Sequence, residues 1–260
     1  MLSFRKIFIV IFIAGHSLTA KAYSGDSTWL NKSNRYIIGA SMGAAIPFLN
    51  FGVPSSTSVY YFGSQFSGYA KSGFHFNVNA EFLITPNFGI KGMVGKNQNS
   101  YNTTAYNNSI SYNDPGTTMV SANSYDSWEY LIGIFINAPF RRHPNLSFNF
   151  SVMGGCMAIN FPTIVTDFSA TSGQDAGESS ISANNAKSFD GDFSLGLHDK
   201  INKHLNVSLD CSFSFAYMQF SNGIYTETVQ GSPSISTTPS NPLNMWIGLF
   251  KPTISLGYLF

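Results

Sequence analysis

Apolar and polar residues alternate along much of this chain with a period of two. In residues 73–84, GFHFNVNAEFLI, every second side chain is apolar, and the remaining positions include His75, Asn77, Asn79 and Glu81. Residues 145–153 and 204–217 repeat the alternation. A period of two is typical of a β-strand with one apolar face and one polar face.

The same test predicts eight strands. They cover residues 34–46, 71–84, 87–97, 126–138, 145–158, 188–200, 204–219 and 243–260. The first strand shows the weakest alternation, because its second face holds only Gly39, Ser41, Gly43 and Ala45. Small side chains are expected inside a narrow barrel.

The predicted connections alternate between short and long. Short, turn-forming segments at 85–87, 140–144 and 201–203 alternate with long segments rich in Ser, Thr, Asn, Tyr and Gly, at 47–70, 98–125, 159–187 and 220–242. Long structureless loops are unusual in a soluble domain but normal in a membrane barrel. The pattern predicts an all-β fold: a closed antiparallel up-and-down transmembrane β-barrel with short periplasmic turns and long extracellular loops. Both termini are then expected on the periplasmic side.

Composition agrees with this fold class. Charged residues make up 10% of the chain and aromatic residues 15%, and no segment after residue 22 is long and apolar enough for a membrane helix. Such a chain is either a secreted all-β protein or a membrane β-barrel. A secreted β-sandwich is the structural alternative.

The N-terminus has the features of a secretory signal peptide. Arg5 and Lys6 precede the apolar run 7–14, and Ala20 and Ala22 frame a small-x-small cleavage site. We expect residues 1–22 to be removed, 23–33 to form a short periplasmic segment and 34–260 to form the barrel; an uncleaved membrane anchor is the alternative. Without residues 1–22 the formal charge falls from +1 to −2, which argues against a nucleic-acid partner.

The polar faces of the predicted strands carry charges. If the second and third strands pair around Pro86, Glu81 faces Lys91, a favourable cross-strand pair. The predicted interior charge network consists of Glu81, Lys91, Glu129, Asp190, Asp192, His198, Asp210 and Lys251. We interpret Asp190, Asp192 and His198 as polar filling and not as a metal site, because an extended strand spreads alternate residues apart.

The chain ends on KPTISLGYLF, in which Leu256, Tyr258 and Phe260 lie on one face. This resembles the C-terminal assembly signal of bacterial outer-membrane barrels, although Ser255 stands where Gly is common. Residues 34–260 as a whole resemble the small eight-stranded outer-membrane barrels: OmpA-type domains, OmpX-like proteins and opacity-type surface proteins. The resemblance implies a location in the bacterial outer membrane and contacts with outer-membrane lipid and the barrel-assembly machinery.

The resemblance implies a surface protein whose neutral loops act in envelope shielding, adhesion or contact with an extracellular or host ligand. Tyr with small polar residues makes an adaptable binding surface. A small porin or narrow channel is the alternative, because eight strands leave an interior just wide enough for side chains. An outer-membrane enzyme is disfavoured, because resemblance to the outer-membrane enzyme families implies a catalytic His in an external loop or on the outer rim, and the long segments contain no His.

Three further groups of residues bear on these predictions. Cys156 and Cys211 have lipid-facing parity on strands that are not neighbours, so no disulfide is expected. His75 and His198 are expected to point inward, without a catalytic role. We predict no cofactor and no metal.

Aromatic residues near strand ends predict girdles at the membrane interfaces: Trp29, Trp128, Trp246, Tyr36, Tyr130 and Tyr258.

Overall fold

The computed structural model describes residues 35–52, 68–113, 117–169, 176–238 and 242–260. The expected signal peptide with Ala20 and Ala22, the segment 23–33 and Trp29 lie outside the described residues.

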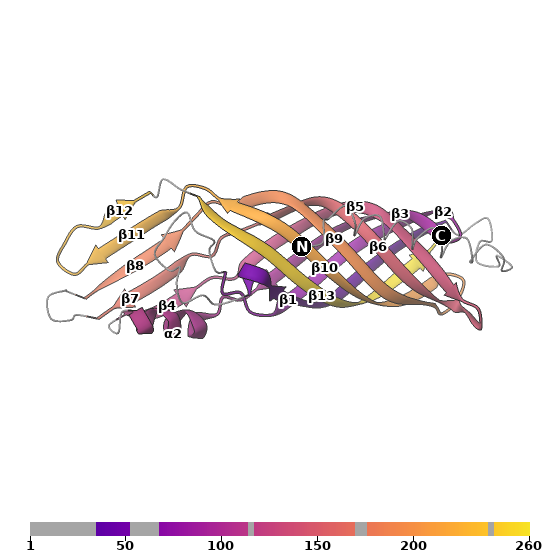
Figure 1. Cartoon of the computed structure of the whole chain (residues 1–260), viewed down its shortest axis with the longest axis horizontal. Helices are drawn as coiled ribbons and strands as arrows, with labels where there is room; N and C mark the ends of the chain where they lie inside the picture. Colours follow the sequence, from indigo (N-terminus) through magenta and orange to yellow (C-terminus); the bar gives the residue numbers. More distant parts are fainter. Residues whose placement is uncertain (1–34, 53–67, 114–116, 170–175, 239–241) are drawn as a thin grey trace, which may run out of the picture.

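Eight antiparallel strands form a closed barrel, which confirms the predicted fold class (Figure 1). In the order in which they pair around the barrel they are β1 (Tyr36–Phe48), β13 (Leu243–Leu259), β10 (Leu205–Phe220), β9 (Ala186–Lys200), β6 (His143–Ile159), β5 (Tyr125–Phe140), β3 (Phe88–Asn99) and β2 (Gly73–Thr85). All lie within two residues of the predicted ranges. Pairing of β1 with β13 closes the ring, with Ile38 opposite Tyr258.

The alternation along each strand divides its side chains between the lumen and the outside. On β2, His75, Asn77 and Glu81 are buried in the lumen, while Phe74 and Val78 are exposed on the exterior. A closed barrel pairs every strand on both sides, so no edge is left among these eight strands.

The two ends of the barrel differ. At one end, here called the turn end, the strands are joined by short turns at 86–87, 141–142 and 201–204. The opposite end carries a projecting structure, here called the extension (Figure 1). The extension consists of a five-stranded sheet and the helix α2 (Thr103–Asn113). Its strands, in sheet order, are β12 (Ile235–Thr237), β11 (Ile224–Val229), β8 (Gly177–Ser182), β7 (Ile164–Phe168) and β4 (Thr117–Ala122).

The extension differs from the long loops expected from the sequence. The segments supply β-branched Thr, Val and Ile, which suit strands, but each strand is too short to show a period of two. Pairing of β8 with β11 joins residues that are far apart in the sequence. The helix α2 begins after Asn102, whose side-chain Oδ1 accepts a hydrogen bond from the backbone N–H of Ala105 (3.2 Å) as an N-cap.

One continuous apolar core joins the extension to the barrel. It runs from the outer part of the lumen, with Ala45 and Leu249, through Tyr125 to Ile164 of β7, and Ile181 of β8 packs against it. The short 3-10 helix η1 (Leu49–Phe51) adds the buried Phe51. No helix among the described residues is long and apolar enough to cross a membrane.

Candidate functional site

A buried ion cluster lies in the middle of the lumen. Lys251 Nζ on β13 is 2.7 Å from Glu129 Oε2 on β5 and 3.1 Å from Asp192 Oδ2 on β9. Ser214 Oγ on β10 donates to Asp192 (2.9 Å) and to Glu129 (3.3 Å). All four residues are completely or almost completely buried. Charges so far from water are tolerated because each is paired and hydrogen-bonded.

A series of hydrogen bonds links this cluster to β2. Asn97 Nδ2 donates to Glu129 Oε1 (3.0 Å), and Asn97 Oδ1 is 2.6 Å from His75 Nδ1. His75 Nε2 is 2.9 Å from Asn77 Nδ2. Both contacts are satisfied together when Nδ1 of His75 carries the proton and Nε2 accepts. Asn97 and Ser214 were not predicted as site residues; their inward parity was the only signal in the sequence.

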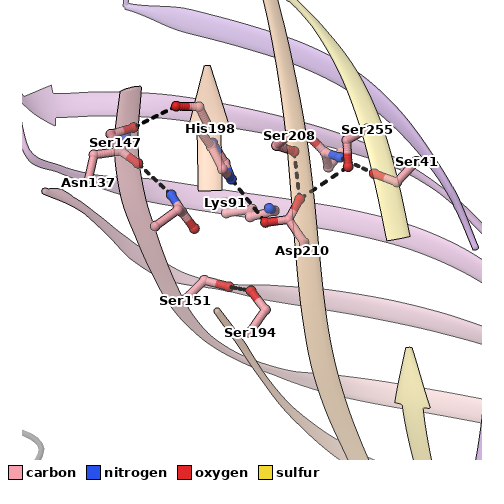
Figure 2. A network of polar contacts seen from close by, with 12 residues as sticks. Ser41, Lys91, Asn137, Ser147, Ser151, Ser194, His198, Ser208, Asp210 and Ser255 are labelled. Carbon is pink, nitrogen blue, oxygen red and sulfur yellow. Dashed lines mark hydrogen bonds and ion pairs between the residues drawn. The ribbon is translucent and has the colours of Figure 1, made fainter. Parts of the chain in front are cut away.

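A second polar cluster lies nearer the turn end and is centred on Asp210 (Figure 2). His198 Nε2 on β9 is 3.0 Å from Asp210 Oδ1 on β10. Ser208 and Ser255 donate to Asp210 Oδ2 from the other side, at 2.6 and 3.2 Å. Gly196 lies beside Asp210, where a Cβ atom would overlap the carboxylate.

The predicted pair Glu81 and Lys91 forms a separate ion pair. The two residues are Cα partners across the β2–β3 hairpin, and Lys91 Nζ lies 3.0 Å from Glu81 Oε1. Both side chains are buried. The side chain of Lys91 therefore points into the lumen. Figure 2 shows it beside Asp210.

Asp190 is the predicted site residue that enters no ion pair among the described residues. Its side chain is completely buried, and neither carboxylate oxygen has a hydrogen-bond partner there. Its cross-strand partners are Gly155 and Ala216, which bring no polar side chain. Within the part of the chain that the structure describes, no group of three or more His, Cys, Asp and Glu residues could hold a metal ion.

The outer part of the lumen is apolar, which the sequence analysis missed. Met157, Met218, Met245, Ile247 and Leu249 all point inward and are fully buried. A signal was present, because β13 has no polar side chain on either face from Met245 to Phe250. The charged clusters thus lie in the middle of the lumen and toward its turn end, whereas the outer part is mostly apolar and includes the buried Asn99, whose Nδ2 donates to the Ala45 carbonyl (2.8 Å).

Aromatic side chains extend this apolar filling to the barrel mouth. Tyr125 packs edge-on against Phe51, with ring centroids 4.9 Å apart, and against Phe161 at 6.4 Å. The Tyr125 hydroxyl donates to the carbonyl of Gly68 (2.8 Å). Tyr101 lies against Tyr125, and burial raises the pKa of its hydroxyl. These contacts connect the barrel mouth to the core of the extension.

Other residues singled out in the sequence lie apart from the lumen. Cys156 is half-buried and Cys211 exposed, both as free thiols. Leu256 and Tyr258 are exposed on the barrel exterior, and the ring of Phe260 lies 4.8 Å from that of Tyr258. The role of this face in assembly stays a prediction.

No family model matches the chain, and no curated protein matches its sequence. Similar solved structures include Ail, the attachment invasion locus protein of Yersinia pestis, in complex with the heparin analogue sucrose octasulfate (8% identity, TM-score 0.39, covering 88% of this chain and 99% of that one). A major outer membrane protein from Thermus thermophilus is 7% identical, with a TM-score of 0.42 and coverage of 86% and 99%. The outer membrane protein OprG from Pseudomonas aeruginosa is 9% identical, with a TM-score of 0.40 and coverage of 88% and 96%. The fold described above rests on this chain's own strand pairing.

Proposed function

We propose that this chain spans the outer membrane of a bacterium and displays the extension at the cell surface, where it contacts outside partners or shields the envelope. The continuous core that joins the extension to the barrel carries the proposal. Because of that core, the extension is a folded, positioned surface and not a set of independent loops.

The barrel exterior supports a membrane location. Large apolar side chains are exposed around it, including Ile132 (67% exposed), Leu209 (60%) and Ile254 (52%). So much exposed apolar surface is unusual for a protein in water. A closed barrel can enter lipid, because all its backbone groups are paired between strands.

The aromatic girdles fit the thickness of a bilayer. Trp246 lies toward the extension end of β13, beside Tyr217 (centroids 5.0 Å apart), and Tyr258 lies at the turn end. The twelve residue-to-residue steps from Trp246 to Tyr258 span about 30 Å at about 3.3 Å per step and a tilt of about 40°. That distance matches the hydrocarbon core of a bilayer, about 30 Å thick.

The side chains that fill the lumen favour a surface protein over a channel. The polar middle of the lumen would suit a narrow pore, but its outer part is filled mostly by buried apolar side chains, which offer no hydrogen bonds to water or ions. His75 and His198 are engaged in lumen contacts, which supports a non-catalytic role.

An epitope inserted after Gly231 tests the display. Gly231 has a φ of 85° in the β11–β12 turn, and a Cβ placed there would meet no atom within 4 Å, so we expect an insertion to be tolerated. The matched control carries the same epitope after Arg141, in the β5–β6 turn at the other end. We expect antibody to label intact cells with the Gly231 insertion, and to label the Arg141 insertion only after permeabilisation. The reverse labelling would refute the proposed orientation.

A further inference from the structure

Asp190 is a buried acid that the ion cluster of the lumen leaves unpaired. Its side chain is fully buried, and neither carboxylate oxygen has a hydrogen-bond partner among the described residues. Asp192, two positions further along β9, is also buried. Its Oδ2 contacts Lys251 and Ser214, but its Oδ1 has no partner in the same part of the chain. Three buried carboxylate oxygens on the lumen side of β9 therefore lack a hydrogen-bond donor.

The charges that face Asp190 do not balance it. Glu129 on β5, Asp192 on β9 and Lys251 on β13 are charged groups that act on it electrostatically. Lys251 is the one cation of the three, and it is already shared by Glu129 and Asp192. The cross-strand partners of Asp190 on β6 and β10 carry no charge. An ionised Asp190 would thus set three buried negative charges against one positive charge.

The other strands do not supply the missing positive charge. His75 on β2 contacts two Asn side chains through its two ring nitrogens, and a neutral ring satisfies both contacts. Lys91 on β3 is paired with Glu81. On the side of the turn end, Asp210 on β10 already has His198 as its partner. The strands β1 and β6 bring no charged side chain to the middle of the lumen.

One bound proton accounts for both the charge and the unpaired oxygens. Burial of an isolated carboxylate is so costly that the group takes up a proton instead. A protonated Asp190 has one O–H donor, and Asp192 Oδ1 is an acceptor on the same side of the strand, about 6.6 Å further along the backbone. Neighbouring carboxyl groups that cannot both ionise share one proton in this way.

We propose that Asp190 is a proton-binding site of the lumen, held as a neutral carboxylic acid whose O–H donates to the carboxylate of Asp192. A proton is favoured over a metal ion, because no group of three or more His, Cys, Asp and Glu side chains among the described residues could hold a metal. The unfolded chain exposes Asp190 to water as a carboxylate, so folding takes up this proton and stability falls as the pH is raised. The inference concerns the barrel alone and holds for either orientation in the membrane.

Infrared spectroscopy of the whole refolded barrel tests for the proton directly. A protonated carboxyl group has a carbonyl stretch that lies apart from the bands of carboxylates and amides. We expect this band in the wild type at neutral pH, its shift when the aspartate carboxyls carry heavy carbon, and its loss at alkaline pH. Asp190→Asn should lack the band. A wild type without the band, or a band that persists in Asp190→Asn, would overturn the inference.

Unfolding in urea provides a second readout. Asp190→Asn replaces one neutral group by another, so it should unfold at the wild-type urea concentration at neutral pH and lose less stability than the wild type at alkaline pH. The matched control Asp192→Asn removes an ionised partner of Lys251 and should unfold at a lower urea concentration already at neutral pH. Equal pH dependence of Asp190→Asn and wild type would contradict the proposal. Stabilisation of the wild type by Na⁺ or K⁺, but not by choline at the same concentration, would replace the proton with a metal cation.

Discussion

At the scale of single residues, the charge balance of the lumen depends on Lys251. It is the only basic side chain that contacts Glu129 and Asp192 among the described residues, and all three side chains are fully buried. Removing a buried charge leaves its partners unpaired, which costs far more than the pair itself contributes.

Lys251→Met is therefore expected to lower the free energy of unfolding by about 3–5 kcal/mol. Urea unfolding, followed by the loss of heat-modifiable gel mobility, measures this change. The variant K251M/E129Q/D192N carries no charge at the cluster and should recover much of the loss. A single variant as stable as the wild type would show that the cluster does not hold the barrel together.

Gly196 is required for the second polar cluster. A Cβ atom at this position overlaps the Asp210 carboxylate, so Gly196→Ala should displace Asp210 from His198 and destabilise the barrel by about 1–3 kcal/mol. Gly92→Ala is the matched control, because the nearest atom to its Cβ is 4.0 Å away. Equal unfolding midpoints for the two variants would contradict this account.

At the scale of elements, the junction between barrel and extension depends on the aromatic cluster. Tyr125 begins β5 and contacts Phe51 and Phe161, so three separate chain segments meet at its ring. The strands of the extension pair with one another in a sheet that is separate from the barrel. Its position relative to the barrel therefore depends on this packing.

Tyr125→Ala should loosen the extension while the barrel remains closed. Truncation of a large buried aromatic residue costs about 3–5 kcal/mol, and here the loss falls on the junction. We expect proteinase K to cleave the extension faster and heat-modifiable mobility to persist. Tyr125→Phe, which loses only the hydrogen bond to Gly68, should be cleaved at nearly the wild-type rate. Equal cleavage of Tyr125→Ala and wild type would disprove the role of this junction.

At the scale of the whole molecule, the lumen of the barrel is divided along its length into a polar part and an apolar part. The ion clusters occupy the middle and turn end of the lumen, and Met218, Met245 and Ile247 occupy the part next to the extension. Ions that enter from the turn end meet an apolar filling before they reach the mouth. We therefore expect the lumen not to conduct ions.

The refolded protein is accordingly expected to give no discrete conductance steps in a planar bilayer. Ile247→Ser combined with Met218→Ser, which makes part of the apolar filling polar, should allow at most a small leak. Lys251→Met serves as the comparison, because it alters the polar part and should stay silent. Regular conductance steps from the wild type would support the channel alternative.

The sequence by itself determined the parts of this protein that depend on neighbouring residues. A period of two specified the eight strands and which side chains face the lumen, because alternate residues on a strand point to opposite sides. A tight turn determined the Glu81–Lys91 pairing, since its register follows from the residues next to it.

Only the tertiary structure decided which inward side chains meet across the lumen. Lys251 and Glu129 are 122 residues apart, and Asn97 joins Glu129 from the adjacent strand β3. These contacts form because the barrel closes, and the closure cannot be read from the pattern of neighbouring residues. The same reason explains the extension, whose short strands are stabilised by pairing between distant segments, such as β8 with β11.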